Sequence, residues 1–172
     1  MKKISHPGND RIELADINEI IEEAITISTN EWRYVADIEV DLDKSITSIP
    51  CFSGELSQVF LNLIVNAAHA IDEAKLGLEK GTIKVSSNPL QSGVEVRIED
   101  DGTGIPEEIR DKVFDPFFTT KEVGKGTGQG LSIVYGIVEN HNGSIRIESE
   151  LGLGTTFVVN LPISQEVEIE SA

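Results

Sequence analysis

Residues 124–134 read GKGTGQGLSIV, with glycine at positions 124, 126, 128 and 130 and apolar residues directly after. Ordering a glycine costs more backbone entropy than ordering any other residue, so alternate glycines need a reason to be ordered. Successive backbone N–H groups without side chains bind anions, and a helix N-terminus behind them adds its dipole. The stretch predicts a phosphate-binding loop leading into a helix. A flexible linker, the alternative, rarely continues directly into an amphipathic helix.

The commonest phosphate-binding motifs do not fit this loop. A P-loop requires Ser or Thr after Gly-Lys, but Lys125 is followed by Gly126. A dinucleotide-binding fingerprint requires glycine at the third position beyond its second glycine, where this chain has Gln129. The acidic turn DDGTG (100–104) is not an EF-hand loop, because Arg97 stands where a calcium ligand is needed. The loop therefore belongs to another class of phosphate site.

A predicted helix over about residues 55–73 carries a polar stripe opposite its apolar face. Asn62, Asn66 and His69 follow one another at spacings of four and three residues, which places them on one side of a helix. A buried amide without a partner costs about 1–3 kcal/mol, so two asparagines beside Leu and Val suggest a ligand. Amide oxygens suit Mg²⁺, which prefers oxygen ligands. Solvent-exposed amides remain the alternative.

Two further segments accompany the loop and the helix. Asp100 ends a predicted strand before a glycine turn, and a carboxylate, which only accepts hydrogen bonds, can select a base with an exocyclic amine such as adenine. Gly102 and Gly104 would let a flat ring approach. Residues 113–121 (VFDPFFTTK) are apolar enough to pack on a nucleotide or a partner. The alternative for the Asp100 segment is an ordinary acidic turn. The alternative for residues 113–121 is a segment that anchors the core.

Composition limits the class of protein. The 172 residues fit one domain, expected over 11–165, with a loose arm at 1–10 and an acidic tail at 166–172. Thirty acidic against 14 basic residues give a net charge of −16, which argues against nucleic acid as a partner. Cys51 is the single cysteine, so no internal disulfide exists, and its apolar setting predicts a core position. No apolar run approaches the ~18 residues of a membrane span.

Periodicity predicts an α+β fold with an antiparallel or mixed sheet and about three helices on one face. Helices are expected from Asp16, from about 55 to 73 with Ser53 as the cap, after Pro106, and over 130–139. Strands are expected at 38–42, at 82–87 and 94–99 around a turn at 88–89, and at 144–149 and 155–161 as a hairpin.

The blocks NLIVNAAHAI, DDGTGI, FDPFFTTK and GKGTGQGLSIV occur in this order along the chain. They resemble the N, G1, F and G2 boxes of the GHKL ATPases, specifically the catalytic and ATP-binding domain of bacterial sensor histidine kinases. The resemblance covers about residues 11–163. It implies a Bergerat-type α/β sandwich with a mobile lid around residues 114–127, and it implies ATP and Mg²⁺ as ligands.

The resemblance also implies a role for each matching residue. Asn66 would coordinate Mg²⁺ on the triphosphate with help from Asn62, Asp100 would bind the adenine amine, and Lys121 would neutralise phosphate charge. The other positions implied for the nucleotide are His69, Gly102, Gly104, Gly126, Thr127, Gly128, Gly130, Leu131 and Thr155. The chain departs from the common pattern with His69 in place of Lys or Arg, Asp101 in place of Asn, and Gln129 in place of Leu.

One position separates a kinase from a hydrolase within this superfamily. Gyrase-like and chaperone-like members are similar to one another in carrying a glutamate, the general base for water, four residues before the Mg²⁺ asparagine. Here that position holds Asn62, and an amide cannot take a proton at neutral pH. A neutral imidazole acceptor is already nucleophilic and needs no such base. The chain is therefore expected to act as a kinase.

None of the three histidines stands in the helical His-Glu setting of the family's phosphoacceptor: His6 lies in the arm, His69 on the polar stripe, and His141 at a helix end. We therefore expect transfer of the γ-phosphoryl group to a dimerisation and phosphoacceptor domain outside this chain, for relay to a response regulator. The domain is expected in the cytoplasm, within a homodimeric parent whose membrane anchoring stays open. A non-catalytic nucleotide-binding docking module is the alternative function.

Overall fold

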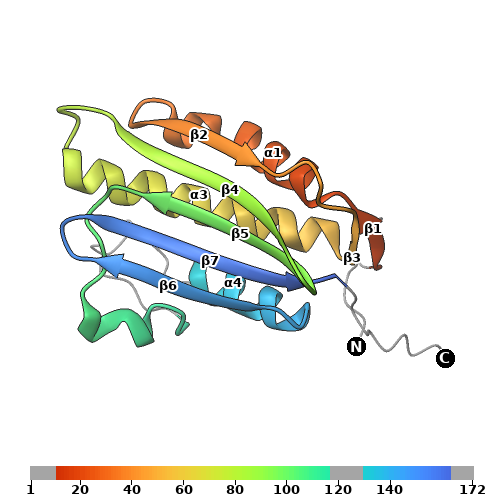
Figure 1. Cartoon of the computed structure of the whole chain (residues 1–172). Helices are drawn as coiled ribbons and strands as arrows, with labels where there is room; N and C mark the ends of the chain where they lie inside the picture. The colour runs from red at the N-terminus through yellow and green to blue at the C-terminus, as the bar shows by residue number, and fades with distance from the viewer. Residues whose placement is uncertain (1–10, 117–129, 164–172) are drawn as a thin grey trace.

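Five strands form a mixed sheet in the order β2–β4–β5–β7–β6 (Figure 1). The computed structural model describes residues 11–116 and 130–163. The sheet contains β2 (Ala36–Leu42), β4 (Gly81–Leu90), β5 (Gly93–Asp100), β6 (Ser144–Glu150) and β7 (Gly154–Pro162). Only the β2–β4 pair is parallel among these strands. The predicted α+β fold with a mixed sheet is confirmed.

Helices α1 (Ile17–Ile27), α3 (Ser53–Lys75) and α4 (Gly130–Asn140) cover one face of the sheet, with α3 in contact with both others (Figure 1). α1 begins where predicted, because the Asp16 carboxylate accepts the backbone N–H groups of Asn18 and Glu19. α2 (Thr29–Trp32) is a short helix that follows α1 in the chain. β1 (Glu13–Ala15) and β3 (Ile49–Cys51) form a separate antiparallel pair at one end.

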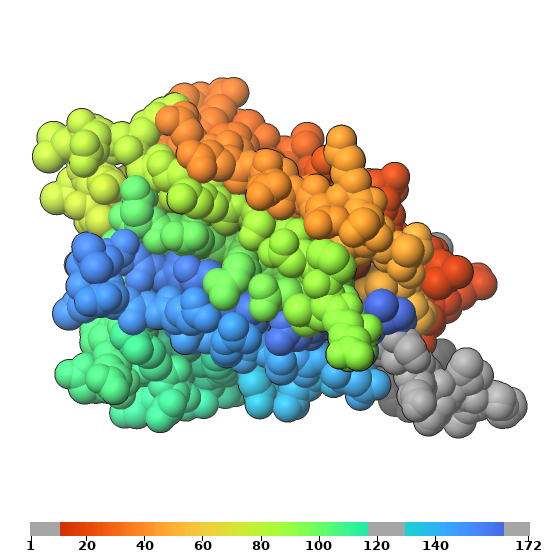
Figure 2. Space-filling model, in the orientation of Figure 1, coloured from red at the N-terminus to blue at the C-terminus, as the bar shows by residue number. Residues whose placement is uncertain are grey.

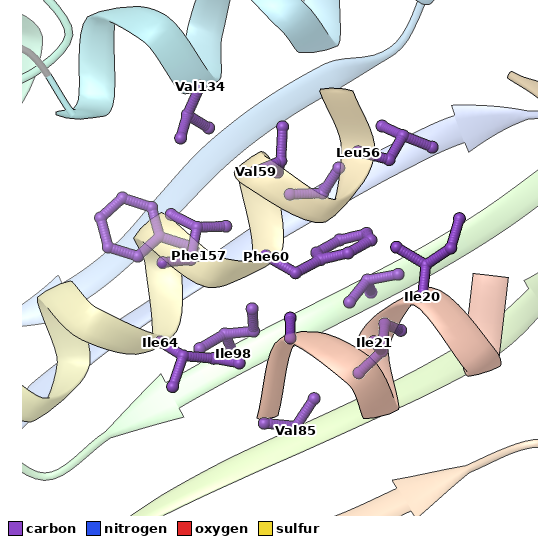
Figure 3. Close-up of a cluster of buried hydrophobic side chains, with 14 of the residues drawn as sticks. Ile20, Ile21, Leu56, Val59, Phe60, Ile64, Val85, Ile98, Val134 and Phe157 are labelled. Carbon is purple, nitrogen blue, oxygen red and sulfur yellow. The ribbon is translucent and has the colours of Figure 1, made fainter. Parts of the chain in front are cut away.

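The core lies between the helices and the sheet. Figure 3 shows Phe60 of α3 directed between α1 and the strands, with Val134 of α4 on the other side of α3. The fully buried side chains are mostly Ile, Leu and Val, as the alternation in the strands and the 3.6-residue period in the helices predict. Cys51 is also buried, at 1% exposure, so its predicted core position is confirmed.

The opposite face of the sheet faces outward (Figure 2). It carries charged side chains. Arg97 of β5 pairs with Glu95 and with Glu148 of β6, each at 3.3 Å, and Arg146 also reaches Glu148. Val158 lies on this face opposite both arginines in the strand register and is nevertheless 1% exposed. The long arginine side chains thus shield the valine while their charged ends remain in water.

Two sequence-based details were wrong. The β4–β5 turn lies at 91–92 rather than 88–89, and Pro89 sits within β4 beyond the last residue paired with β2, where no ladder N–H is needed on that side. Ser53 is the first residue of α3 and Phe52 its cap. The short helix predicted after Pro106 is confirmed and is of the 3₁₀ type, η1 (Glu107–Lys112). The predicted arm, lid and acidic tail fall mainly outside the described residues.

Candidate nucleotide site

Three polar side chains stand in a row at one end of the sheet. Asp100 ends β5, Thr155 lies opposite it near the start of β7, and Ser149 lies opposite Thr155 near the end of β6. The next inward-facing row on the same three strands is apolar, with Ile98, Phe157 and Ile147. Side chains alternate between the faces of a sheet, so both rows face the helices. The polar row therefore marks where the core gives way to a site.

Asp100 is a buried acceptor with 6% of its surface exposed. Burial raises the pKa of its carboxyl group to about 6, while hydrogen bonds from the backbone of Gly102 and Thr155 partly offset this rise. The bond from the Gly102 N–H measures 2.8 Å. Among the described residues, no cation pairs with Asp100. Such a carboxylate gains from any ligand that brings an N–H donor.

Asp101 turns away from this row. Its Oδ1 accepts the backbone N–H of Thr82 at 2.9 Å, and its Oδ2 lies 4.0 Å from Nζ of Lys75. The negative charge of Asp101 is therefore partly engaged by the start of β4 and by Lys75. Its remaining influence is on the pKa of Asp100, which it raises.

The glycines of the acidic turn are required by packing against protein. A Cβ on Gly102 would lie 2.5 Å from the backbone carbonyl carbon of Ala70 in α3, and one on Gly104 would lie 2.3 Å from the backbone oxygen of Glu150. Gly104 also has a φ of +79°, which side-chain-bearing residues rarely adopt. From their sequence setting, these glycines were expected to make room for a flat ring. In the structure they let the turn pack between α3 and the β6–β7 hairpin.

The amides of Asn62 and Asn66 lie half-buried on α3. Within the part of the chain that the structure describes, neither side chain makes a hydrogen bond. Their oxygens fit the preference of Mg²⁺ for hard oxygen ligands. No cluster of three His, Cys, Asp or Glu residues that could hold a metal occurs in the described ranges. A magnesium ion at α3 would therefore depend on phosphate oxygens and water for most of its ligands.

His69 lies toward α2. Its Nε2 is 3.9 Å from Oε1 of Glu31, and the two side chains are 43% and 52% exposed. An ion pair at this distance forms only when the imidazole is protonated. The structure thus brings His69 near an acidic side chain that sequence spacing could not indicate.

At the start of α4, none of the described atoms lies within 4 Å of a Cβ placed on Gly130, and Leu131 packs against the core. Lys121, Gly126, Thr127 and Gly128 lie outside the described residues.

Arg110 and Ser149 were missed by sequence reasoning. The Arg110 guanidinium donates to the backbone oxygens of Ile105 and Ser149, so it ties η1 to the acidic turn and to β6. The Ser149 hydroxyl accepts the Ile105 N–H at 2.8 Å and lies 2.9 Å from the Thr155 hydroxyl. The hairpin register across Gly152 and Gly154 could have paired Ser149 with Thr155. The position of Arg110 gave no comparable signal.

Residues 53–165 match the family described as histidine kinase-, DNA gyrase B- and HSP90-like ATPases. The chain belongs to this family. It is 36% identical to the sensor kinase CckA of Brucella abortus over 88% of its length, and 32% identical to the sensor histidine kinase ZraS of Escherichia coli over 92%. It spans only 17% and 32% of these relatives' own lengths.

Solved structures of the same family agree. The nucleotide-free catalytic domain of histidine kinase ThkA has a TM-score of 0.77 and 34% identity, covering 91% of this chain and 98% of that one. The mycobacterial sensor histidine kinase MprB has a TM-score of 0.74 and 26% identity, covering 90% and 99%. The resemblance to the catalytic and ATP-binding domain of sensor histidine kinases is thereby confirmed. No helix among the described residues is long and apolar enough to cross a membrane.

Proposed function

We propose that this chain binds Mg²⁺-ATP and transfers the γ-phosphoryl group to a histidine on a dimerisation and phosphoacceptor domain outside residues 1–172, in two-component signalling. The observation that carries the proposal is the pair Asn62 and Asn66, one turn apart on α3 with amides that no described residue engages. Family membership supports ATP as the nucleotide, and the names of the relatives support a histidine acceptor.

The purine would lie at the polar row. Asp100 accepts a hydrogen bond from the exocyclic amine, and Thr155 stands beside it on β7. Gly102 and Gly104 act by holding the turn against α3 and the hairpin, so that the carboxylate keeps its position. The triphosphate would extend along α3 toward the start of α4, where the glycines before Gly130 supply backbone N–H donors. His69, Leu131 and Lys121 complete the proposed nucleotide contacts.

The chemistry at α3 would be neutralisation rather than base catalysis. Bound Mg²⁺ would offset the charge of the phosphate oxygens, with Asn66 as its protein ligand and Asn62 assisting. Because neither amide can accept a proton at neutral pH, neither Asn62 nor Asn66 activates water. The acceptor imidazole attacks the γ-phosphorus through its unprotonated nitrogen, the bond to the β-phosphate oxygen breaks, and ADP leaves. The protein contribution is positioning and charge.

The wider setting follows from the relatives and is proposed with the activity. The phosphoryl group would pass from the acceptor histidine to a response regulator, and the parent would be a homodimer whose catalytic domain lies in the cytoplasm. This chain covers 17% of the length of CckA. The other 83% of that relative, by difference, is ample sequence for an acceptor domain.

Calorimetric titration with Mg²⁺-ATP, followed by phosphotransfer to the acceptor domain of the parent gene, tests the proposal. Asn66→Asp should abolish Mg²⁺-dependent binding, because a carboxylate beside the triphosphate adds repulsion. Asn88→Asp, the same charge change at an exposed position on β4, should bind as the native chain does. Full affinity in Asn66→Asp would contradict the metal assignment. Tight binding without transfer would favour the docking module, and no binding would overturn the proposal.

A further inference from the structure

The Ser149 hydroxyl contacts three polar atoms but has only one hydrogen to donate. Its Oγ lies 2.8 Å from the Ile105 backbone nitrogen, 3.0 Å from the Gly154 carbonyl oxygen and 2.9 Å from Oγ1 of Thr155. The Ile105 N–H can only donate, and the Gly154 carbonyl can only accept. The Ser149 hydrogen is therefore directed to Gly154. Only this arrangement makes all three contacts hydrogen bonds, and it requires Thr155 to donate to Ser149.

We propose that Ser149 fixes the direction of the Thr155 hydroxyl, so that Thr155 offers only lone pairs to a ligand beside Asp100. The inference rests on the proposed nucleotide site and makes Ser149 a positioning residue that acts on purine selectivity through Thr155. The alternative arrangement, in which Ser149 donates to Thr155, loses the bond to Gly154 and leaves the Thr155 hydrogen available to a ligand.

The surroundings hold Ser149 in place for this role. Ser149 and Thr155 are directly paired in the β6–β7 register, and Thr155 and Asp100 are directly paired in the β7–β5 register. Thr155 is 5% exposed, so water has little access to its hydroxyl. The Arg110 guanidinium donates to the backbone oxygens of Ser149 and Ile105. It thereby holds in place both the residue that carries the hydroxyl, Ser149, and the residue whose N–H this hydroxyl accepts, Ile105.

Two neighbouring acceptors select one kind of base edge. The ionised Asp100 carboxylate and the Thr155 lone pairs both require donors, and the adenine amine supplies two N–H groups. A purine with a carbonyl at that position presents an acceptor instead, and buried polar groups left unpaired discriminate strongly. If the Thr155 hydroxyl could rotate, it would donate to that carbonyl and weaken the discrimination. Ser149 prevents this rotation by taking the hydrogen.

Affinities for ATP and inosine triphosphate, which carries a carbonyl in place of the amine, test this inference. Ser149→Ala should lower the ratio of ATP to inosine triphosphate affinity roughly tenfold, the effect of one unpaired group. Thr155→Val should lower it as well, since the acceptor is lost. Adding Ser149→Ala to Thr155→Val should then change the ratio no further, because Ser149 acts through the hydroxyl that is already gone. Ser144→Ala, at an exposed position on β6, is the matched control.

An equal loss of affinity for both nucleotides in Ser149→Ala would show a merely structural role and overturn the inference, as would the same change of ratio in both backgrounds. If Ser149→Ala does not fold, Ser149→Cys keeps the shape of the side chain with a much weaker acceptor and should lower the ratio in the same direction. ATP binding with an unchanged ratio refutes this inference alone. Failure of the native chain to bind ATP refutes the proposed function too.

Discussion

The imidazole of His141, at the end of α4, accepts the backbone N–H of Phe52, the residue that caps α3, at 3.1 Å. Its other nitrogen, Nδ1, lies 2.9 Å from the Ile137 oxygen, to which it donates. The ring also meets the Phe52 ring edge-on, with centroids 5.6 Å apart. His141 is 2% exposed and uses both nitrogens in these bonds, so its role is structural. It joins the two helices that border the proposed triphosphate site.

Replacing His141 should loosen this junction. His141→Phe keeps a ring but leaves the Phe52 N–H and the Ile137 oxygen without their partner, which we expect to cost about 2 kcal/mol of unfolding free energy. Urea denaturation measures the loss, and faster hydrogen exchange at the Phe52 amide localises it. Asn140→Ala, one residue earlier and exposed, is the control. An unchanged exchange rate at Phe52 would contradict the assigned bond.

Asp100 should make the stability of the free domain depend on pH. Its folded pKa of about 6 lies above the ordinary value of 3.8, so the folded state binds the proton more tightly. The resulting stabilisation is complete below the ordinary pKa and is lost as pH rises through about 6. Two pKa units correspond to about 3 kcal/mol.

Asp100→Asn removes this titration. Its unfolding free energy relative to the native chain should therefore rise by up to about 3 kcal/mol between pH 4 and pH 7.5. Urea denaturation across this range measures the difference, and Asp41→Asn at an exposed position of β2 is the control. A difference that stays constant with pH would show that Asp100 does not titrate as the structure indicates. Selectivity for ATP should fall in the same variant, because the amide can turn its N–H donors to the base.

Gly154 and Gly152 should tolerate alanine very differently. A Cβ on Gly154 would lie 2.0 Å from the backbone oxygen of Asp100, whereas none of the described atoms lies within 4 Å of a Cβ on Gly152. Both have positive φ, +129° and +87°. Gly152→Ala should cost about 1 kcal/mol through backbone strain alone. Gly154→Ala should cost about 3 kcal/mol or more, because β7 must move from β5. Equal losses in urea denaturation would contradict this contact.

Cys51 should resist alkylation in the folded domain. Burial, and secondarily the charge of Glu13, raise the pKa of its thiol from 9.0 to about 11. The thiolate is the reactive form, so two pKa units make reaction with iodoacetamide at pH 8 roughly 100-fold slower than in the unfolded chain, before any steric protection. Mass spectrometry with and without urea measures the ratio. Equal rates would show that β3 opens readily.

Local sequence patterns predicted much of the fold. The helical period of α3, the alternation of β5 and the glycines between β6 and β7 predicted element types because each pattern involves residues close in the chain. The predicted boundaries of β4 and α3 were less accurate, at Pro89 and Ser53. The end of a strand or helix depends on which strand or turn lies beside it.

The sequence by itself determined the family, the stripe of Asn62 and Asn66, and the carboxylate that ends β5, since these depend on residue type and spacing within single elements. Only the tertiary structure decided that Asp100 is buried without a cation among the described residues, that Gly102 meets Ala70, and that His141 bonds to Phe52. The tertiary structure also decides the protonation of Asp100 and the directions of the Ser149 and Thr155 hydroxyls. Burial and hydrogen-bond partners come from segments distant in sequence, and their packing cannot be read from the residues of one element.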